Sequence, residues 1–372
     1  MKKKAKILLL VSLILLGSFL TFKISKVNIS ANEIILINQK GIAISSSFYL
    51  KLKNIGLTDA EIDVLSVDEF EKYYNMNISY TNKDVYFIKT EKLHNEDGTS
   101  EINHSYISYN DYLNEMNIQS SGYNSRIIGP DFSYDDGDDT GGGILYPSVS
   151  AYNTVDYKKI TVNSTYYYDE GSNGRFFAKT TFEWLSEPIE RNTDVIALNF
   201  TNNIGIGSKT LFDNQYLDFG SKMIYTDTTI LTYDDASTTS SYVRREVLIN
   251  GTDSGMYKYD QNAGIAVQHK LPENFGELKD PLGNIRMETH IMSDIVITLY
   301  ADFVPLNTGI NAVTFVGVYQ HQIKQMVIDW GDISLQLSSP FISYTLGSIS
   351  TEEIYEDAIS KELVFEDLSS YN

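Results

Sequence analysis

The chain has 372 residues, no cysteine and a formal net charge of −20. The lack of cysteine excludes disulfides, thiolate metal sites and cysteine nucleophiles. The strong negative charge and the lack of a basic patch in the sequence also exclude binding to the phosphate backbone of nucleic acids. The 27 tyrosines and 17 phenylalanines, with many Thr, Ile and Val, favour β-strands.

The N-terminus has the layout of a secretory signal peptide over residues 1–31. Four lysines lie in the first six residues, and Ile7–Leu16 is apolar apart from Ser12. The alternative is an uncleaved membrane anchor over residues 7–22, although these 16 residues are fewer than the roughly 20 that span a bilayer. We expect a secreted or cell-surface protein. Cleavage would remove six lysines and no acid, which changes the net charge from −20 to −26.

Residues 32–116 are predicted to form a small region of mixed helices and strands. Two short helices are indicated by capping boxes, in which Thr58 is followed by Glu61, and Ser66 by Glu69. Gly56 lies where a preceding helix would end. The other expected elements are a strand pair at Ile34–Ile37 and Ile42–Ile44, a helix at Ser47–Asn54, strands at Asp84–Leu93 and Glu101–Tyr109, and a helical turn at Asp111–Met116.

An acidic, glycine-rich stretch over residues 117–143 is predicted to be a linker. No cofactor is assigned, but calcium takes about six to eight oxygen ligands, so the carboxylates of this stretch make calcium a candidate. The spacing differs from that of the helix-loop-helix calcium loop, because Phe132 and Tyr134 occupy ligand positions. A solvated linker without metal explains the same residues and is the leading interpretation, with calcium binding as the alternative. The candidate calcium ligands are Asp131, Asp135, Asp136, Asp138 and Asp139.

Residues 144–345 predict an antiparallel, sandwich-like β domain, so the expected fold class is mainly β. The clearest alternation covers residues 174–200 and predicts a long hairpin with one buried face that carries Trp184. Asn250-Gly251 is a second hairpin signal. Residues 346–372 are expected to be an acidic helix or tail, with Thr351–Phe365 as the amphipathic part. Further strands are expected at Asp156–Tyr168, Met223–Tyr233, Tyr242–Ile249, Gly255–Tyr259, Ala263–Leu271, Met287–Phe303, Ala312–Trp330 and Ile333–Leu337.

No serine elbow, phosphate loop or dinucleotide fingerprint is present, so no catalytic residue is assigned. Glu288 and His290 are expected to share one face of a strand, where a distant His321 could join them at a metal. The apolar residues that alternate with His321 instead favour a hydrogen-bonded place at the edge of the core. Carboxylates near the two tryptophans, at Glu183, Asp329 and Asp332, leave glycoside cleavage open. The remaining histidines are His94, His104 and His269.

Several short motifs resemble those of an uncharacterised group of exported, all-β proteins of Gram-positive bacteria. Besides the signal peptide, they are Gly56-Leu57-Thr58-Asp59-Ala60-Glu61-Ile62, Phe182-Glu183-Trp184-Leu185, Asp194-Val195-Ile196-Ala197-Leu198 and Val318-Tyr319-Gln320-His321. The resemblance implies an exported protein with a β architecture. It implies no activity, cofactor or catalytic residue.

The leading hypothesis is an exported, non-enzymatic, β-rich protein that acts at the cell surface or outside the cell through tyrosine-rich faces. Its partner is not identified by the sequence. Ile224–Ser241 alternates Tyr, Thr and Ile with many Ser and Thr, as a membrane-inserting hairpin would. A membrane-active or pore-forming β protein is therefore one alternative, and a secreted glycan or cell-wall hydrolase is another. Otherwise, membrane contact is expected only through an uncleaved N-terminal segment.

Overall fold

The fold is mainly β and antiparallel, which confirms the predicted fold class. Within the described residues, the few helices lie in the first third of the chain. The structure, a computed structural model, describes residues 34–94, 100–122, 152–168, 174–188, 191–200, 204–206, 219–251, 253, 255–260, 264–279, 285–306, 313–322, 333–338, 341–346 and 354–357.

The first described residues form a compact group of helices beside a strand pair, which we call the helical module (residues 34–76). Both predicted capping boxes are present in it. The Thr58 hydroxyl accepts the backbone N–H of Glu61, whose carboxylate accepts the N–H of Thr58 in return, and Ser66 and Glu69 repeat the pattern. Gly56, with a φ of +95°, follows the first helix as predicted. The elements are β1 (Ile34–Ile37), β2 (Ala43–Ser45), α2 (Ser46–Asn54), α3 (Asp59–Asp63) and α4 (Val67–Asn75).

A nine-stranded antiparallel sheet forms the centre of the fold, in the order β10-β9-β14-β6-β5-β3-β4, with β13 and β8 also paired to β14. β3 pairs with both β4 and β5, so strands from both sides of the predicted linker lie in this one sheet. Its strands are β3 (Asn77–His94), β4 (Ser100–Ile107), β5 (Tyr152–Tyr168), β6 (Arg175–Trp184), β8 (Ile204–Ile206), β9 (Phe219–Tyr233), β10 (Thr238–Asn250), β13 (Phe275–Leu278) and β14 (Ile285–Pro305).

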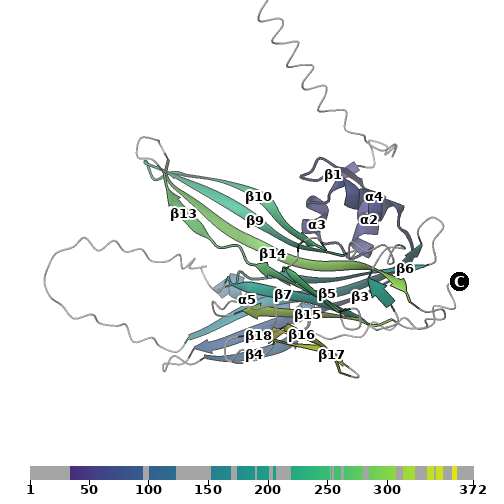
Figure 1. Ribbon diagram of the computed structural model, residues 1–372. Coiled ribbons are helices and arrows are strands. Elements are labelled where there is room, and N and C mark those ends of the chain that lie inside the picture. Colours follow the sequence, from purple (N-terminus) through teal and green to yellow (C-terminus); the bar gives the residue numbers. More distant parts are fainter. Residues whose placement is uncertain are drawn as a thin grey trace, which may run out of the picture.

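A second sheet, of five strands in the order β11-β12-β7-β15-β18, packs on one face of the first and makes a sandwich with it (Figure 1). The Phe182 ring of one sheet stacks on the Tyr319 ring of the other, with 3.3 Å between ring centroids. The helical module covers the opposite face of the nine-stranded sheet. The remaining elements are α5 (Tyr109–Gly122), β7 (Thr193–Phe200), β11 (Tyr257–Asp260), β12 (Gly264–Lys270), β15 (Phe315–Gln322), β16 (Ile333–Ser338), β17 (Phe341–Leu346) and β18 (Ile354–Asp357).

The predicted hairpin over residues 174–200 is wrong. β6 pairs with β5 and β14 in the nine-stranded sheet, whereas β7 pairs with β12 and β15 in the other sheet. The prediction of a single buried face also fails. The helical module covers the face of β6 that carries Lys179, and the five-stranded sheet covers the face that carries Phe182. The alternation of apolar and polar residues correctly predicts both strands, but it does not specify which strands they pair with.

Two further local predictions fail. Asn250-Gly251 does not close a hairpin, because β10 before it and β11 after it lie in different sheets. Of the stretch Thr351–Phe365, predicted to be a helix or a tail, only residues 354–357 are described, and these four form strand β18 instead of a helix. Residues 117–122 of the predicted linker close helix α5, and the rest of that stretch lies outside the described residues.

One end of the nine-stranded sheet projects beyond the sandwich, as the β9, β10, β13 and β14 labels of Figure 1 show. We call this part the arm (residues 226–245, 275–278 and 285–293). Burial along β9 falls from complete at Ser221 to partial from Thr228 onward. A bulge in β14 around Asp294, whose φ is +51°, marks the base of the arm.

The arm has two chemically different faces, because successive side chains of a strand alternate between the faces. The pairing register places the charged side chains Asp227, Arg245, Glu277, Glu288 and His290 on one face. The opposite face, on the same side of the sheet as the helical module, is uncharged beyond the base of the arm. It carries Thr228, Ile230, Thr232, Thr238, Ser240, Tyr242, Leu278, Met287, Thr289 and Ile291.

Candidate functional site

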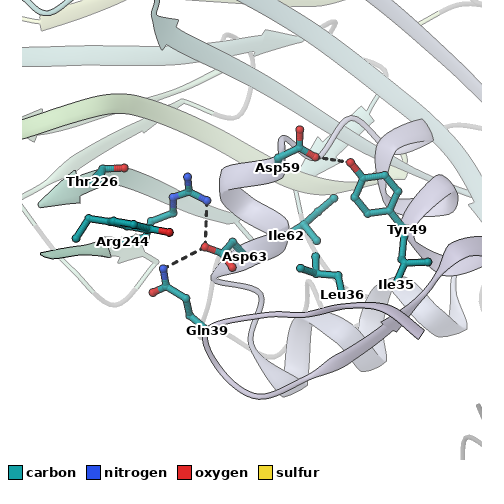
Figure 2. A pocket seen from close by; sticks show the side chains of 10 residues that line it. Ile35, Leu36, Gln39, Tyr49, Asp59, Ile62, Asp63, Thr226 and Arg244 are labelled. Carbon is teal, nitrogen blue, oxygen red and sulfur yellow. Dashed lines mark hydrogen bonds and ion pairs between the residues drawn. The ribbon is translucent and has the colours of Figure 1, made fainter. Parts of the chain in front are cut away.

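An open cleft of about 460 Å³ lies between the helical module and the base of the arm (Figure 2). Its volume falls within the range of about 300–1,000 Å³ that is usual for small-molecule sites. The lining residues are Ile35, Leu36, Gln39, Tyr49, Asp59, Ile62, Asp63, Thr226, Tyr242 and Arg244.

The arm supplies one wall of the cleft from two paired strands. Arg244 of β10 lies directly opposite Thr226 of β9, and Tyr242 is two residues away on the same face. The α3 helix supplies the facing carboxylates. Asp59 and Asp63 are four residues apart and therefore lie on the same side of α3.

Arg244 joins the arm to the helical module through Asp63. The guanidinium Nη1 lies 3.0 Å from Asp63 Oδ2, and both side chains are about one-quarter exposed, at 27% and 24%. Gln39 donates from its amide Nε2 to the same carboxylate oxygen over 3.1 Å. Figure 2 shows both interactions converging on Asp63. A charged bridge therefore joins the two parts of the chain that line the cleft.

The second carboxylate of the cleft is also paired. Tyr49 donates its hydroxyl to Asp59 Oδ1 over 2.6 Å, and Lys53 Nζ lies 3.2 Å from the same oxygen. Partial burial opposes ionisation of Asp59, but these two contacts outweigh it and lower the pKa of this carboxyl from its ordinary value. The hydrogen bond to Asp59 raises the pKa of Tyr49. At neutral pH the cleft therefore holds an ionised Asp59 and a neutral Tyr49.

Apolar surface remains open between these polar groups. The Tyr242 side chain is 80% exposed and Ile35 is 55% exposed, whereas Ile62, which also lines the cleft, is fully buried. Among the described lining residues there is no histidine or serine, and each carboxylate already has a cationic partner. The arrangement is suited to holding a ligand by contact and hydrogen bonding.

The sequence-predicted calcium ligands, Asp131 to Asp139, lie outside the described residues, as do Asp329 and Asp332. Calcium binding therefore stays a prediction. Glu183 is described and forms an ion pair with Lys159, at 2.6 Å. Within the described residues, no group of three or more His, Asp or Glu side chains has the geometry to hold a metal ion.

The predicted pair of Glu288 and His290 is confirmed, on the charged face of the arm. His290 Nε2 lies 3.1 Å from Glu288, and Nδ1 lies 2.8 Å from Asp227. The Asp227 contact is the main cause that raises the pKa of His290. The Phe275 ring stacks on the imidazole, with 4.3 Å between centroids.

His321 does not join this pair, because it lies in β15 of the other sheet. It is buried with Nδ1 at 2.6 Å from the buried Asp194, which confirms the predicted hydrogen-bonded place in the core. Trp184 also donates to Asp194, over 3.4 Å. His269 pairs with Ser221 over 2.7 Å, but both are buried and so form no accessible catalytic pair. His94 and His104 lie on the neighbouring strands β3 and β4.

No protein-family model matches the chain, and a search of curated proteins finds no match. Among the described residues, no helix has both the length and the apolar character to cross a membrane. The cleft itself has no sequence motif. Asp59 and Asp63 on one side of a capped helix are its only local signal, and nothing in the sequence connects them to Arg244.

Proposed function

We propose that the protein is an exported, non-enzymatic binding protein that acts at the cell surface or outside the cell and holds its ligand in the cleft. The observation that carries the proposal is the Arg244–Asp63 bridge, which places an open, mixed polar and apolar cleft between the arm and the helical module. The signal-peptide pattern of residues 1–31 supports the location.

The cleft has the features of a binding site. Pockets for small molecules combine apolar and aromatic surface with a few oriented polar groups. Here Tyr242 and Ile35 supply the exposed apolar surface, while Asp63 and Arg244 are oriented by each other. Because the polar groups are fixed before a ligand arrives, little ordering is needed on binding.

A binding screen with paired variants tests the proposal. The full-length protein is exposed to immobilised glycans, peptides and lipids, beside Tyr242→Ala and Tyr106→Ala. Tyr106 is a matched control, because it is 62% exposed and lies in β4 at the other edge of the sheet. We expect at least one probe class to lose binding with Tyr242→Ala alone. Equal binding of every probe by all three proteins would contradict the proposal.

Cell fractionation tests the location separately. Immunoblots of the medium, the cell surface and the cytoplasm of producing cells should place the protein in the first two fractions. Recovery of the full-length protein only from the cytoplasm would contradict export.

A membrane-active protein is the second candidate, and the uncharged face of the arm favours it. Leu278 is 84% exposed, Tyr242 80% and Met287 38% on this face, which is unusual for a soluble surface of this charge. Dye release from zwitterionic and anionic liposomes decides between the candidates. Leakage that is lost in Leu278→Lys but kept in Glu277→Lys, on the charged face, would support membrane activity. No leakage at micromolar protein would remove it.

A further inference from the structure

We infer that the cleft binds a neutral saccharide of one or a few sugar rings. This inference rests on the proposed binding function and names the ligand class of that site. The cavity of about 460 Å³ is large enough for a small molecule and too small for a folded partner. Three properties of its lining select the class.

The first property is charge. Arg244 is neutralised by Asp63, and Asp59 by Lys53. Among the described lining residues, a phosphate or carboxylate ligand would find no unpaired cation, and a cationic side chain would find no unpaired carboxylate. Bringing either ion in would require desolvation without a new opposite charge. The lining therefore favours a ligand that is polar but uncharged.

The second property is hydrogen-bonding capacity. Among the described residues, Gln39 and Arg244 both donate to Oδ2 of Asp63, so its other oxygen, Oδ1, can accept a hydrogen bond from a ligand. Arg244 uses Nη1 and keeps further N–H donors, and Gln39 keeps its amide oxygen. The carboxylate, guanidinium and amide groups of these residues are planar and offer donors and acceptors side by side. Neighbouring hydroxyls on a sugar ring match them, because each hydroxyl both donates and accepts a hydrogen bond.

The third property is the exposed apolar surface beside these groups. The Tyr242 ring is 80% exposed, so it does not pack into the core, and Ile35 is 55% exposed. A sugar ring has polar edges and an apolar face of C–H groups, which stacks on an aromatic ring while its hydroxyls meet the polar groups. A ligand with only polar groups would make no apolar contact with Tyr242 and Ile35. An apolar ligand would remove water from Asp63 and Arg244 without replacing its hydrogen bonds.

Titration calorimetry on the full-length protein tests the inference with three neutral probes: maltotriose, cellotriose and triacetylchitotriose. Trigalacturonate and trilysine serve as charged probes of similar size. We expect at least one neutral trisaccharide to bind and both charged probes to fail. Tyr242→Ala and Arg244→Ala should each weaken binding about tenfold or more, because each removes a central contact.

Two matched variants control for indirect effects. Arg245 is the next residue of β10, faces the other side of the arm and is also paired with an aspartate, Asp227. Arg245→Ala and Tyr106→Ala should leave saccharide binding within about twofold of the wild type. Thermal melts of all four variants confirm that each is folded.

The outcomes separate the two proposals. If the wild type binds another probe class in a Tyr242-dependent way and no neutral saccharide, the saccharide inference fails and the binding function stands. If no probe of any class binds, both fail. Equal loss of saccharide binding in Arg244→Ala and Arg245→Ala would place the sugar outside the cleft and overturn the inference.

Discussion

The ammonium of Lys179 in β6 forms an ion pair with the carboxylate of Glu61 in α3, although 118 residues separate them in the sequence. Both side chains are buried, at 1% and 6% exposure, and Lys179 also donates to the Gly56 carbonyl over 2.9 Å. Burial lowers the pKa of Lys179, and the charge of Glu61 opposes this. The pair fixes where the helical module docks, because the capping box already holds Glu61 in place.

Lys179→Met should reduce the free energy of unfolding by about 3–5 kcal/mol, because it leaves the Glu61 carboxylate buried and unpaired. Urea denaturation followed by circular dichroism measures the change. The more exposed pair of Lys159 and Glu183 is the control, with side chains 25% and 19% exposed. Lys159→Met should cost about 1 kcal/mol or less.

The double variant Lys179→Met/Glu61→Gln gives a second check on the same pair. Glutamine still completes a capping box and carries no charge, so most of the loss should be recovered. A double variant less stable than Lys179→Met alone would contradict the unpaired-charge explanation.

His269 should make the protein less stable as the pH falls. Burial lowers its pKa to about 4 from an ordinary 6.5, and Nδ1 has no hydrogen-bond partner among the described residues. Between these two values the unfolded chain binds a proton that the folded chain does not, so the free energy of unfolding falls with falling pH. The full difference is about 3 kcal/mol. Unfolding midpoints at pH 7 and pH 4.5 measure the larger part of this difference, because the remainder is lost only below the folded pKa of about 4.

His269→Gln isolates this contribution, because glutamine does not titrate and can still hydrogen-bond to Ser221. The variant should lose less stability than the wild type between these two pH values. An identical pH dependence in both proteins would show that other groups cause it.

His290 should have the opposite effect, confined to the arm. Asp227 is the main cause that raises its pKa, with Glu288 adding to it and burial opposing. A raised pKa means that the stabilisation is fully present below the unfolded value and is lost as the pH rises through the folded value. Hydrogen-exchange protection of the outer β9–β14 amides should therefore be greater at pH 6 than at pH 9. Asp227→Asn should lower the pKa of His290 in an NMR titration. An unchanged titration would contradict this account.

Trp184→Ala should reduce stability by about 3–5 kcal/mol, because a large buried ring is removed. The side chain is 6% exposed, packs edge-on against Phe182, and has the Lys158 ammonium 4.8 Å from its ring centroid. Trp184→Phe keeps most of the volume and should lose clearly less. A Trp184→Ala variant as stable as the wild type but unable to bind ligand would assign the ring a functional role instead.

Calcium should raise the melting temperature of the full-length protein, because binding to the native state stabilises it. The carboxylates concerned are those of residues 131–139. Scans with a chelator and with millimolar calcium measure the shift, and magnesium serves as the control. Identical melting temperatures in all three conditions would remove calcium from the list of ligands.

Local sequence signals predicted the local structure well. The capping boxes at Thr58 and Ser66 are complete within four residues, so the chain alone specifies them. Strand positions were likewise predictable, because alternation reflects a buried face. Glu288 and His290, two residues apart in one strand, were correctly placed together for the same reason.

Strand partners and the cleft were not predictable, because both depend on residues far apart in the chain. β6 and β7 are neighbours in sequence but lie in different sheets, and alternation has the same period in either arrangement. The cleft joins Asp63 to Arg244 across 181 residues. Alternation predicts one buried face for β6, and the ion pair with the distant Glu61 explains why Lys179, on the opposite face from Phe182, is buried as well.

β14 is a single strand of 21 residues that runs from the outer part of the arm, through the bulge at Asp294, into the centre of the nine-stranded sheet. The arm residues that line the cleft belong to β9 and β10, and β9 pairs directly with β14, so a pull on a ligand there would reach the centre of the sheet through the hydrogen bonds between these strands. Hydrogen bonds beside a strand pulled along its axis are loaded in shear and must break together. Under the proposed binding function, this arrangement would oppose the detachment of a ligand held in the cleft. The arm is also not a separable domain, because deleting it would truncate β14, which lies in the centre of the nine-stranded sheet.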